Sequence, residues 1–157
     1  MFAEIDNFSD AYLISLGFLP VRISVFDRWL TEQEASEIRI FTYSQAQKTG
    51  HLAEYLAGEA RFVMFYNILS ESAGASVIAK VRGEPRRVAA AELHSLVLDS
   101  LRETRPMDLH IEGLGIGVLG GFDRTDLVLC KDQRGADVVA NAALEAGLHI
   151  LPPHLDT

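Results

Sequence analysis

The sequence predicts a single α+β domain, in which helices pack on a mixed, mostly antiparallel sheet. Its 157 residues, with 48% hydrophobic and 23% charged side chains, are typical of one globular domain with a substantial core. Strand-like and helix-like segments are intermixed without regular alternation, and the chain has no internal repeat or low-complexity tract. We therefore assign residues 1–151 to one domain and residues 152–157, which begin with two prolines, to a short C-terminal tail.

The first three predicted elements are a helix, a strand and a second helix. Residues 7–18 favour a short helix that ends at Gly17, because apolar side chains recur there with helical spacing. Residues 20–26 alternate apolar and polar side chains, as a half-buried strand does. Residues 31–34 form a capping box that opens a helix, whose end is left open because residues 37–44 also favour a strand. The predicted apolar face of the first helix consists of Phe8, Tyr12 and Leu16.

The middle of the chain predicts a helix followed by paired strands. Residues 49–60 favour a helix that ends near Gly58. Residues 61–70 are almost continuously apolar, which is typical of a central strand covered on both faces. Residues 75–83 are expected to pair back on that strand as a hairpin, and residues 84–87 to form a polar turn.

The C-terminal half predicts two helices and two strands besides the glycine-rich stretch. Residues 88–104 form the clearest helical pattern, and Pro106 stops it. Residues 126–130 favour a strand, residues 135–147 a helix stopped by its last glycine, and residues 148–151 a short last strand. The helical repeat of residues 88–104 consists of Ala89, Leu93, Leu96, Val97 and Leu101.

The glycines between residues 113 and 121 include the spacing of a dinucleotide-binding fingerprint, Gly115-x-Gly117-x-x-Gly120. That fingerprint works only where a helix follows the glycines directly, because the helix N-terminus binds the pyrophosphate. Here a turn-like segment and a strand follow, so a nucleotide site is not expected. In a strand, Gly113, Gly115 and Gly117 would share one bare face, and the burial pattern changes sides across Gly113. A helix of the same domain, a partner segment or a ligand would fill such a face.

The charge and the cysteine content limit the classes of function. The formal net charge of −8 and the pI of about 5.0 argue against binding of nucleic acid, which normally requires a basic face. A single cysteine, Cys130, excludes an intramolecular disulfide, and its place at the end of an apolar strand indicates a buried, inert thiol. No segment favours a membrane span or a signal peptide, so we expect a cytoplasmic protein, and the excess of arginine over lysine suggests a bacterial source.

No pattern in the sequence indicates a catalytic site, so we name no catalytic residue, no metal ligand and no cofactor. His110 and Glu112 project from the same face of a predicted strand, but a metal site needs further ligands, and the lone Cys130 does not complete one. Nucleophilic catalysis would require a serine or cysteine beside a base, and no such motif is present.

A cluster of acidic side chains is the main candidate for a binding surface. It centres on the predicted second helix, where it would either form one negative face that imitates phosphates or simply be a solvated exterior. Trp29, just before the capping box, is expected to be a core anchor or a helix staple, or, if exposed, a binding hot spot. The candidate partner-binding residues are Glu32, Glu34, Glu37, Glu54, Glu59, Gly115, Gly117, Asp123 and Arg124.

These observations favour a non-enzymatic bacterial interaction protein, specifically an immunity or antitoxin-like protein that binds and neutralises a basic toxin domain. The first alternative is a small enzyme or ligand-binding domain with a pocket over the face of Gly113, Gly115 and Gly117. The side chains expected near this pocket are His110, Glu112, Asp123 and Arg124. The second alternative is a subunit of a phage or secretion assembly.

Overall fold

The computed structural model describes residues 9–72, 74, 76–121 and 124–153. They form one seven-stranded sheet, in the order β3-β2-β4-β5-β6-β1-β7, and every neighbouring pair is antiparallel. The helices are α1 Asp10–Ser15, α2 Glu32–Glu37, α3 Tyr43–Thr49, α4 Leu52–Ser72, α5 Ala90–Leu101 and α6 Gln133–Ala146. The strands are β1 Leu19–Ser24, β2 Val77–Val81, β3 Glu84–Val88, β4 Asp108–Ile111, β5 Ile116–Leu119, β6 Thr125–Cys130 and β7 His149–Leu151. The predicted α+β class is confirmed.

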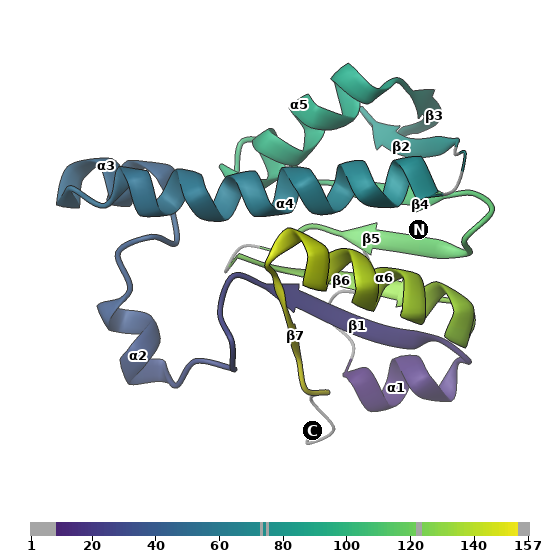
Figure 1. Ribbon diagram of the computed structural model, residues 1–157, viewed down its shortest axis with the longest axis horizontal. Helices are drawn as coiled ribbons and strands as arrows, with labels where there is room; N and C mark the ends of the chain where they lie inside the picture. The colour runs from purple at the N-terminus through teal and green to yellow at the C-terminus, as the bar shows by residue number, and fades with distance from the viewer. Residues whose placement is uncertain (1–8, 73, 75, 122–123, 154–157) are drawn as a thin grey trace.

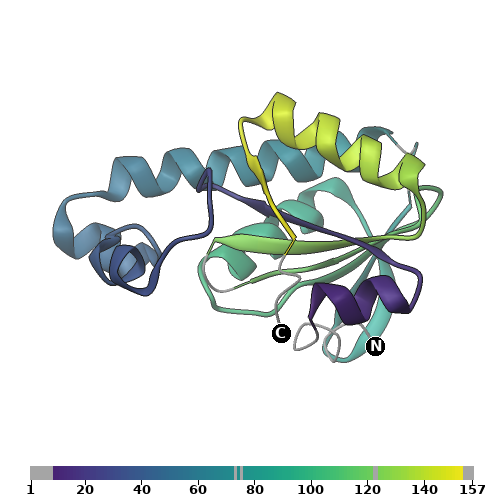
Figure 2. The same ribbon diagram turned by 90° about the horizontal axis from the view of Figure 1, so that it is seen from below.

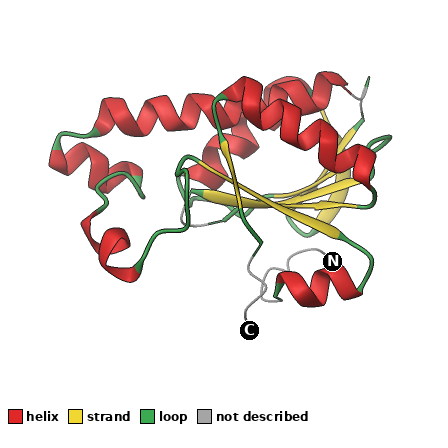
Figure 3. Ribbon diagram, turned by 60° about the horizontal axis from the view of Figure 1, so that its bottom comes forward, coloured by secondary structure: helices red, strands yellow, loops and turns green. Residues whose placement is uncertain are grey.

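The helices lie in unequal layers on the two faces of the sheet. Helices α4, α5 and α6 cover one face and bury the main core with it, and α1 lies on the opposite face (Figures 2 and 3). Leu13 of α1 packs there against Leu127 and Leu129 of β6. Residues 32–49, which carry α2 and α3 and which we call the arm, stand beyond the end of the sheet beside the start of α4 (Figure 1).

Several elements form where the sequence predicts them, because their local signals agree with their packing. The capping box is present at Thr31, whose hydroxyl accepts from the Glu34 amide at 3.1 Å and whose amide donates back to the Glu34 carboxylate at 3.2 Å. Helix α5 buries all of its predicted repeat except Ala89, its exposed N-cap. Helix α6 ends at Gly147, which has a φ of +77°.

Residues 61–70 were predicted as a central strand, and this is wrong because they continue helix α4. Gly58 therefore lies inside the helix and not near its end. The outer and flanking positions of the same stretch are apolar as well: Met64 is 43% exposed, and Val63 and Ile68 are half-buried. These three side chains hide the helical period, so the segment has the continuous apolar character of a buried strand. The residues that the helix buries in this stretch, at helical spacing, are Phe62, Phe65, Tyr66 and Leu69.

Four smaller predictions also differ from the structure. Residues 84–87 are part of the edge strand β3 and not a turn. Strand β2 forms its hairpin with β3 and not with residues 61–70, and this hairpin turns at Arg82 and Gly83, which have φ values of +52° and +82°. Residues 37–44 form no strand, since α2 ends at Glu37 and α3 begins at Tyr43. Helix α1 buries Leu13 and leaves Tyr12 and Leu16 exposed, the reverse of the predicted face; Phe8 lies outside the described residues.

The glycine-rich stretch is a tight hairpin between β4 and β5 and not one long strand. Gly113 and Gly115 have φ values of +81° and +62°, which glycine adopts without strain, and they form the turn. Gly117 is the one member of the three that lies within a strand, between His110 of β4 and Leu129 of β6. The predicted change of the buried face across Gly113 therefore arises because the chain reverses direction there, from β4 into β5.

Candidate functional site

The predicted acidic residues occupy different environments. Glu32 and Glu37 are exposed on α2, and Glu54 is exposed in the first turn of α4. Glu34 closes the capping box and pairs with the guanidinium of Arg28, and these contacts hold the pKa of its carboxyl below its ordinary value. The exposed acidic surface of the arm therefore centres on α2.

Glu59 does not belong to this surface, contrary to the expectation of one exposed acidic face. Its side chain is 7% exposed, and its two carboxylate oxygens accept from Nε and Nη2 of Arg102 at 2.9 and 2.8 Å. This bidentate pair joins α4 to the end of α5. Its role in the structure is to hold two helices together.

Arg124 is also buried, so it faces the core and not a partner. It is 2% exposed, and its Nη1 and Nη2 atoms donate to the carbonyl oxygens of Ile40 and Tyr55, both at 3.3 Å. Removal from water lowers the pKa of the guanidinium, although it stays the cation that the ring of Tyr55 attracts. The neighbouring candidate, Asp123, lies outside the described residues.

Rings and guanidinium groups form a ladder that holds the arm against the domain. Arg102 lies over the ring of Tyr43 at 4.7 Å, Tyr43 meets Tyr55 edge-to-face at 5.7 Å, and Arg124 lies over Tyr55 at 4.2 Å. The hydroxyl of Tyr55 donates to the carbonyl of Leu101 at 3.1 Å. Residues from α3, α4, α5 and the start of β6 thus meet, and no local sequence pattern predicts this because they are far apart in the chain.

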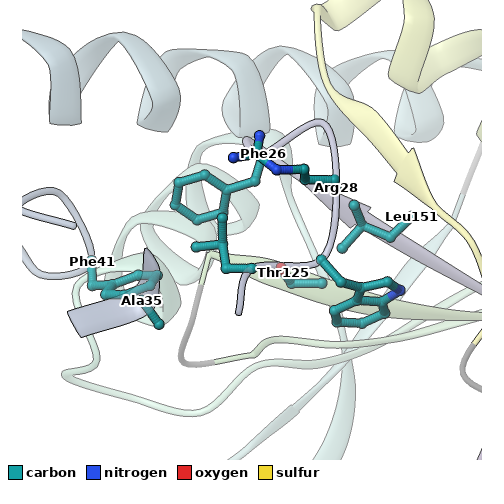
Figure 4. A pocket seen from close by; sticks show the side chains of 8 residues that line it. Phe26, Arg28, Ala35, Phe41, Thr125 and Leu151 are labelled. Atoms are coloured by element: carbon teal, nitrogen blue, oxygen red, sulfur yellow. The ribbon is translucent and has the colours of Figure 1, made fainter. Parts of the chain in front are cut away.

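A small pocket of about 120 Å³, which we call the arm pocket, lies where the arm joins the sheet (Figure 4). Figure 4 shows the side chains of Phe26, Phe41 and Ala35 on one side and Leu151 of β7 across from them. The rings of Phe26 and Phe41 meet edge-to-face at 5.6 Å. The residues that line the arm pocket are Phe26, Arg28, Trp29, Leu30, Ala35, Phe41, Thr125 and Leu151.

The walls of the arm pocket are held by specific contacts. The Trp29 indole N–H donates to the carbonyl of Pro152 at 2.7 Å, which ties the segment after β1 to the end of β7. At the base, the Thr125 hydroxyl donates to the Ser24 hydroxyl at 2.9 Å. Ala35 belongs to α2, so the exposed Glu32, three residues before it, lies on the same side of this helix, whereas Glu37 lies at its end. Of the residues that line the arm pocket, Trp29 is the one that the sequence indicates as a candidate binding residue.

A second and larger hollow, about 440 Å³, lies on the sheet face that carries α1, and we call it the glycine-face depression. The ligand-binding alternative expects a pocket near here, but the lining differs in detail: Gly115, Gly117 and His110 take part, and Gly113 does not. Glu112 lies near Arg87 instead, at 3.6 Å. The residues that line the glycine-face depression are Leu16, Gly17, Phe18, His110, Gly115, Gly117, Leu129 and Lys131.

The described ionisable groups are largely committed to structural contacts. Burial raises the pKa of the Cys130 thiol to about 12, so this sulfur carries a proton at neutral pH. The Tyr66 hydroxyl donates to the buried carboxylate of Asp126, which also accepts from the Gly121 amide at 2.9 Å. No group of three or more potential metal ligands occurs among the described residues.

None of the helices in the described part of the chain is both long and apolar enough to cross a bilayer. Comparison with protein families, with curated proteins and with solved structures finds no match to this chain.

Proposed function

We propose that this chain is a non-enzymatic interaction protein that binds a basic protein partner through α2 and the arm pocket. The observation that carries the proposal is the position of Ala35: it lines an aromatic pocket and belongs to a helix whose Glu32 and Glu37 are exposed. An apolar pocket beside carboxylates suits a protruding apolar side chain on a basic surface.

The rigidity of the site supports this proposal. The ring ladder holds the arm at Tyr43, and the Trp29 indole is fixed by its hydrogen bond to Pro152. A preorganised surface loses little conformational entropy on binding, so more of the interaction energy remains for affinity. The negative charge of the whole chain, −8, accelerates encounter with a basic partner.

Within this class, the form we propose is a bacterial, cytoplasmic immunity or antitoxin-like protein. Carboxylates on a small rigid arm can occupy the basic substrate site of a toxin domain that acts on nucleic acid, where they take the place of phosphates. Binding then blocks the toxin by occupancy and requires no chemistry from this chain.

The test is affinity capture of the partner by the tagged full chain from the cells that naturally contain it. Glu32→Lys/Glu37→Lys reverses the acidic surface, and Ala35→Leu fills the arm pocket. We expect one specific protein to be retained by the native chain and lost with either variant. The purified partner is then assayed for toxicity with and without the chain.

Glu71→Lys/Glu84→Lys is the matched control. It changes the net charge by the same amount, but on the exposed end of α4 and on edge strand β3, away from the arm (Figure 1). This control is expected to retain the partner. Equal retention by all variants contradicts the proposed surface, and a partner whose activity the chain does not inhibit contradicts the immunity function.

A further inference from the structure

The floor of the glycine-face depression is open because a strand residue there has no side chain. Gly117 pairs with His110 on one side and with Leu129 on the other, so these three positions form one row across the sheet. Side chains at both ends of the row and none at its centre leave a gap above the backbone of β5. The apolar surface of Leu129 borders this gap.

The end of α1 forms an apolar wall of the same depression. Leu16, Gly17 and Phe18 line it where the helix stops and the chain turns into β1. Phe18 packs against the small core beneath α1, whereas Leu16 is 51% exposed. The depression thus presents hydrocarbon from the end of α1 and from β6 to an occupant, with the imidazole of His110 beside it.

Lys131 places a positive charge at the rim. Its amide donates to the carbonyl of Gly115 at 2.9 Å, and its stem packs over this glycine: a Cβ on Gly115 would lie 3.2 Å from the Lys131 Cβ. The side chain is exposed, and no carboxylate among the described residues pairs with it. A cation without a counter-charge beside an apolar hollow is complementary to an anion with an apolar body.

We infer that the glycine-face depression binds a small apolar carboxylate, with its hydrocarbon over Gly117 and Leu129 and its carboxylate at Lys131. The volume, about 440 Å³, falls within the range of small-molecule sites, roughly 300–1,000 Å³. This site lies on the face that carries α1 and shares no lining residue with the arm pocket. It is therefore independent of the proposed partner surface.

The test uses the full chain and two probes of equal length, decanoate and decanol, below their aggregation concentrations, with binding measured by calorimetry. We expect decanoate to bind with one site per chain and about tenfold more tightly than decanol, because a hydrogen bond to a charged group adds to the shared apolar contact. Equal affinity for the two probes overturns the assignment of a carboxylate ligand.

Substitutions at the rim test the location without disturbing the core. Lys131→Met keeps the stem over Gly115 and removes the charge, so decanoate affinity should fall about tenfold while decanol affinity stays the same. Leu16→Glu introduces a repelling carboxylate at an exposed position and should weaken decanoate binding further. Lys48→Met on α3 changes the net charge as Lys131→Met does and should leave both affinities unchanged.

Decanoate binding that neither Lys131→Met nor Leu16→Glu weakens overturns the proposal, as does the absence of decanoate binding to the full chain. Binding that appears only after residues 1–8 are deleted overturns it as well, because the depression would then be a docking site for the chain's own N-terminus.

Discussion

The guanidinium carbon of Arg124 lies 4.2 Å from the centroid of the Tyr55 ring, and Arg124 is 2% exposed. Its Nη2 atom also donates to the carbonyl of Tyr55, so one side chain binds both the ring and the backbone of the same residue. A third contact, from Nη1 to the carbonyl of Ile40, reaches the chain between α2 and α3. Arg124 therefore connects the strand layer to α4 and to the arm.

Arg124→Ala should destabilise the protein by about 3 kcal/mol, because it removes the hydrogen bonds to the carbonyls of Ile40 and Tyr55 and opens a cavity beside Tyr55. The measurement is urea unfolding followed by circular dichroism. Arg134→Ala, at an exposed position of α6, is the control and should stay within about 0.5 kcal/mol of the native chain. A loss below about 1 kcal/mol for Arg124→Ala would falsify the structural role of this side chain.

Gly58→Ala should also destabilise the protein, by about 1–3 kcal/mol, although alanine is the better helix former. A Cβ at this position would lie 2.7 Å from Nη2 of Arg124 and 3.1 Å from Cγ1 of Val25. The guanidinium cannot retreat, because two hydrogen bonds and the Tyr55 ring hold it.

A double-mutant cycle separates this clash from other effects of Gly58→Ala. In the Arg124→Ala background the approach to the guanidinium is removed and only the 3.1 Å approach to Cγ1 of Val25 remains, so Gly58→Ala should cost clearly less than in the native chain. If Gly58→Ala lowers the free energy of unfolding equally in both backgrounds, the close approach of Arg124 does not explain why residue 58 is a glycine.

Glu59→Gln should lower the free energy of unfolding by about 1–3 kcal/mol, since it breaks a bidentate pair whose carboxylate is buried while Arg102 remains partly in water. Glu37→Gln, at an exposed position of α2, should change stability by less than about 0.5 kcal/mol. Chemical denaturation of the two variants compares them directly, and equal effects would contradict the different environments of these two glutamates.

The buried thiol of Cys130 makes stability depend on alkaline pH. Its pKa is about 12 in the folded chain, against an ordinary value of 9.0, chiefly because burial disfavours the thiolate. Between these values the unfolded chain loses the proton and the folded chain keeps it, so this contribution is complete below pH 9 and declines as pH rises toward 12. The decline is at most about 1.4 kcal/mol per pH unit.

Cys130→Val isolates this contribution, because it removes the thiol and retains a side chain of similar size in the core. Urea unfolding in reducing buffer at several pH values between 8 and 11 should show native stability falling more steeply with pH than that of the variant. Parallel curves for the two chains would show that the thiol titrates alike in both states.

The predictable parts of the fold are those whose local signals and packing agree. Helix α5 has an apolar stripe against a polar remainder, and the capping box at Thr31 determines the start of α2 by hydrogen bonds within one turn. In α4 the outward-facing Met64 and its half-buried neighbours conceal the helical period. Packing against the sheet decides that this segment is a helix and not a strand, and the pattern of residues along the sequence does not contain this information.

The candidate sites were only partly predictable for the same reason. Exposed Glu32 and Glu37 carry a local signal, and Gly117 marks a bare position in a strand. The arm pocket assembles Phe26, Phe41 and Leu151 from separate parts of the chain, so no spacing in the sequence indicates it.

The sequence by itself determined the α+β class, the positions of helices α5 and α6, the start of α2 and the acidic charge, because these depend on residue type and on neighbours within a few positions. Tertiary structure alone decided that Glu59 and Arg124 are buried, that α4 is one long helix and that two hollows lie on different parts of the surface. The physical reason is that burial and pairing depend on which segments meet across the sheet. That meeting is set by the packing of the whole chain.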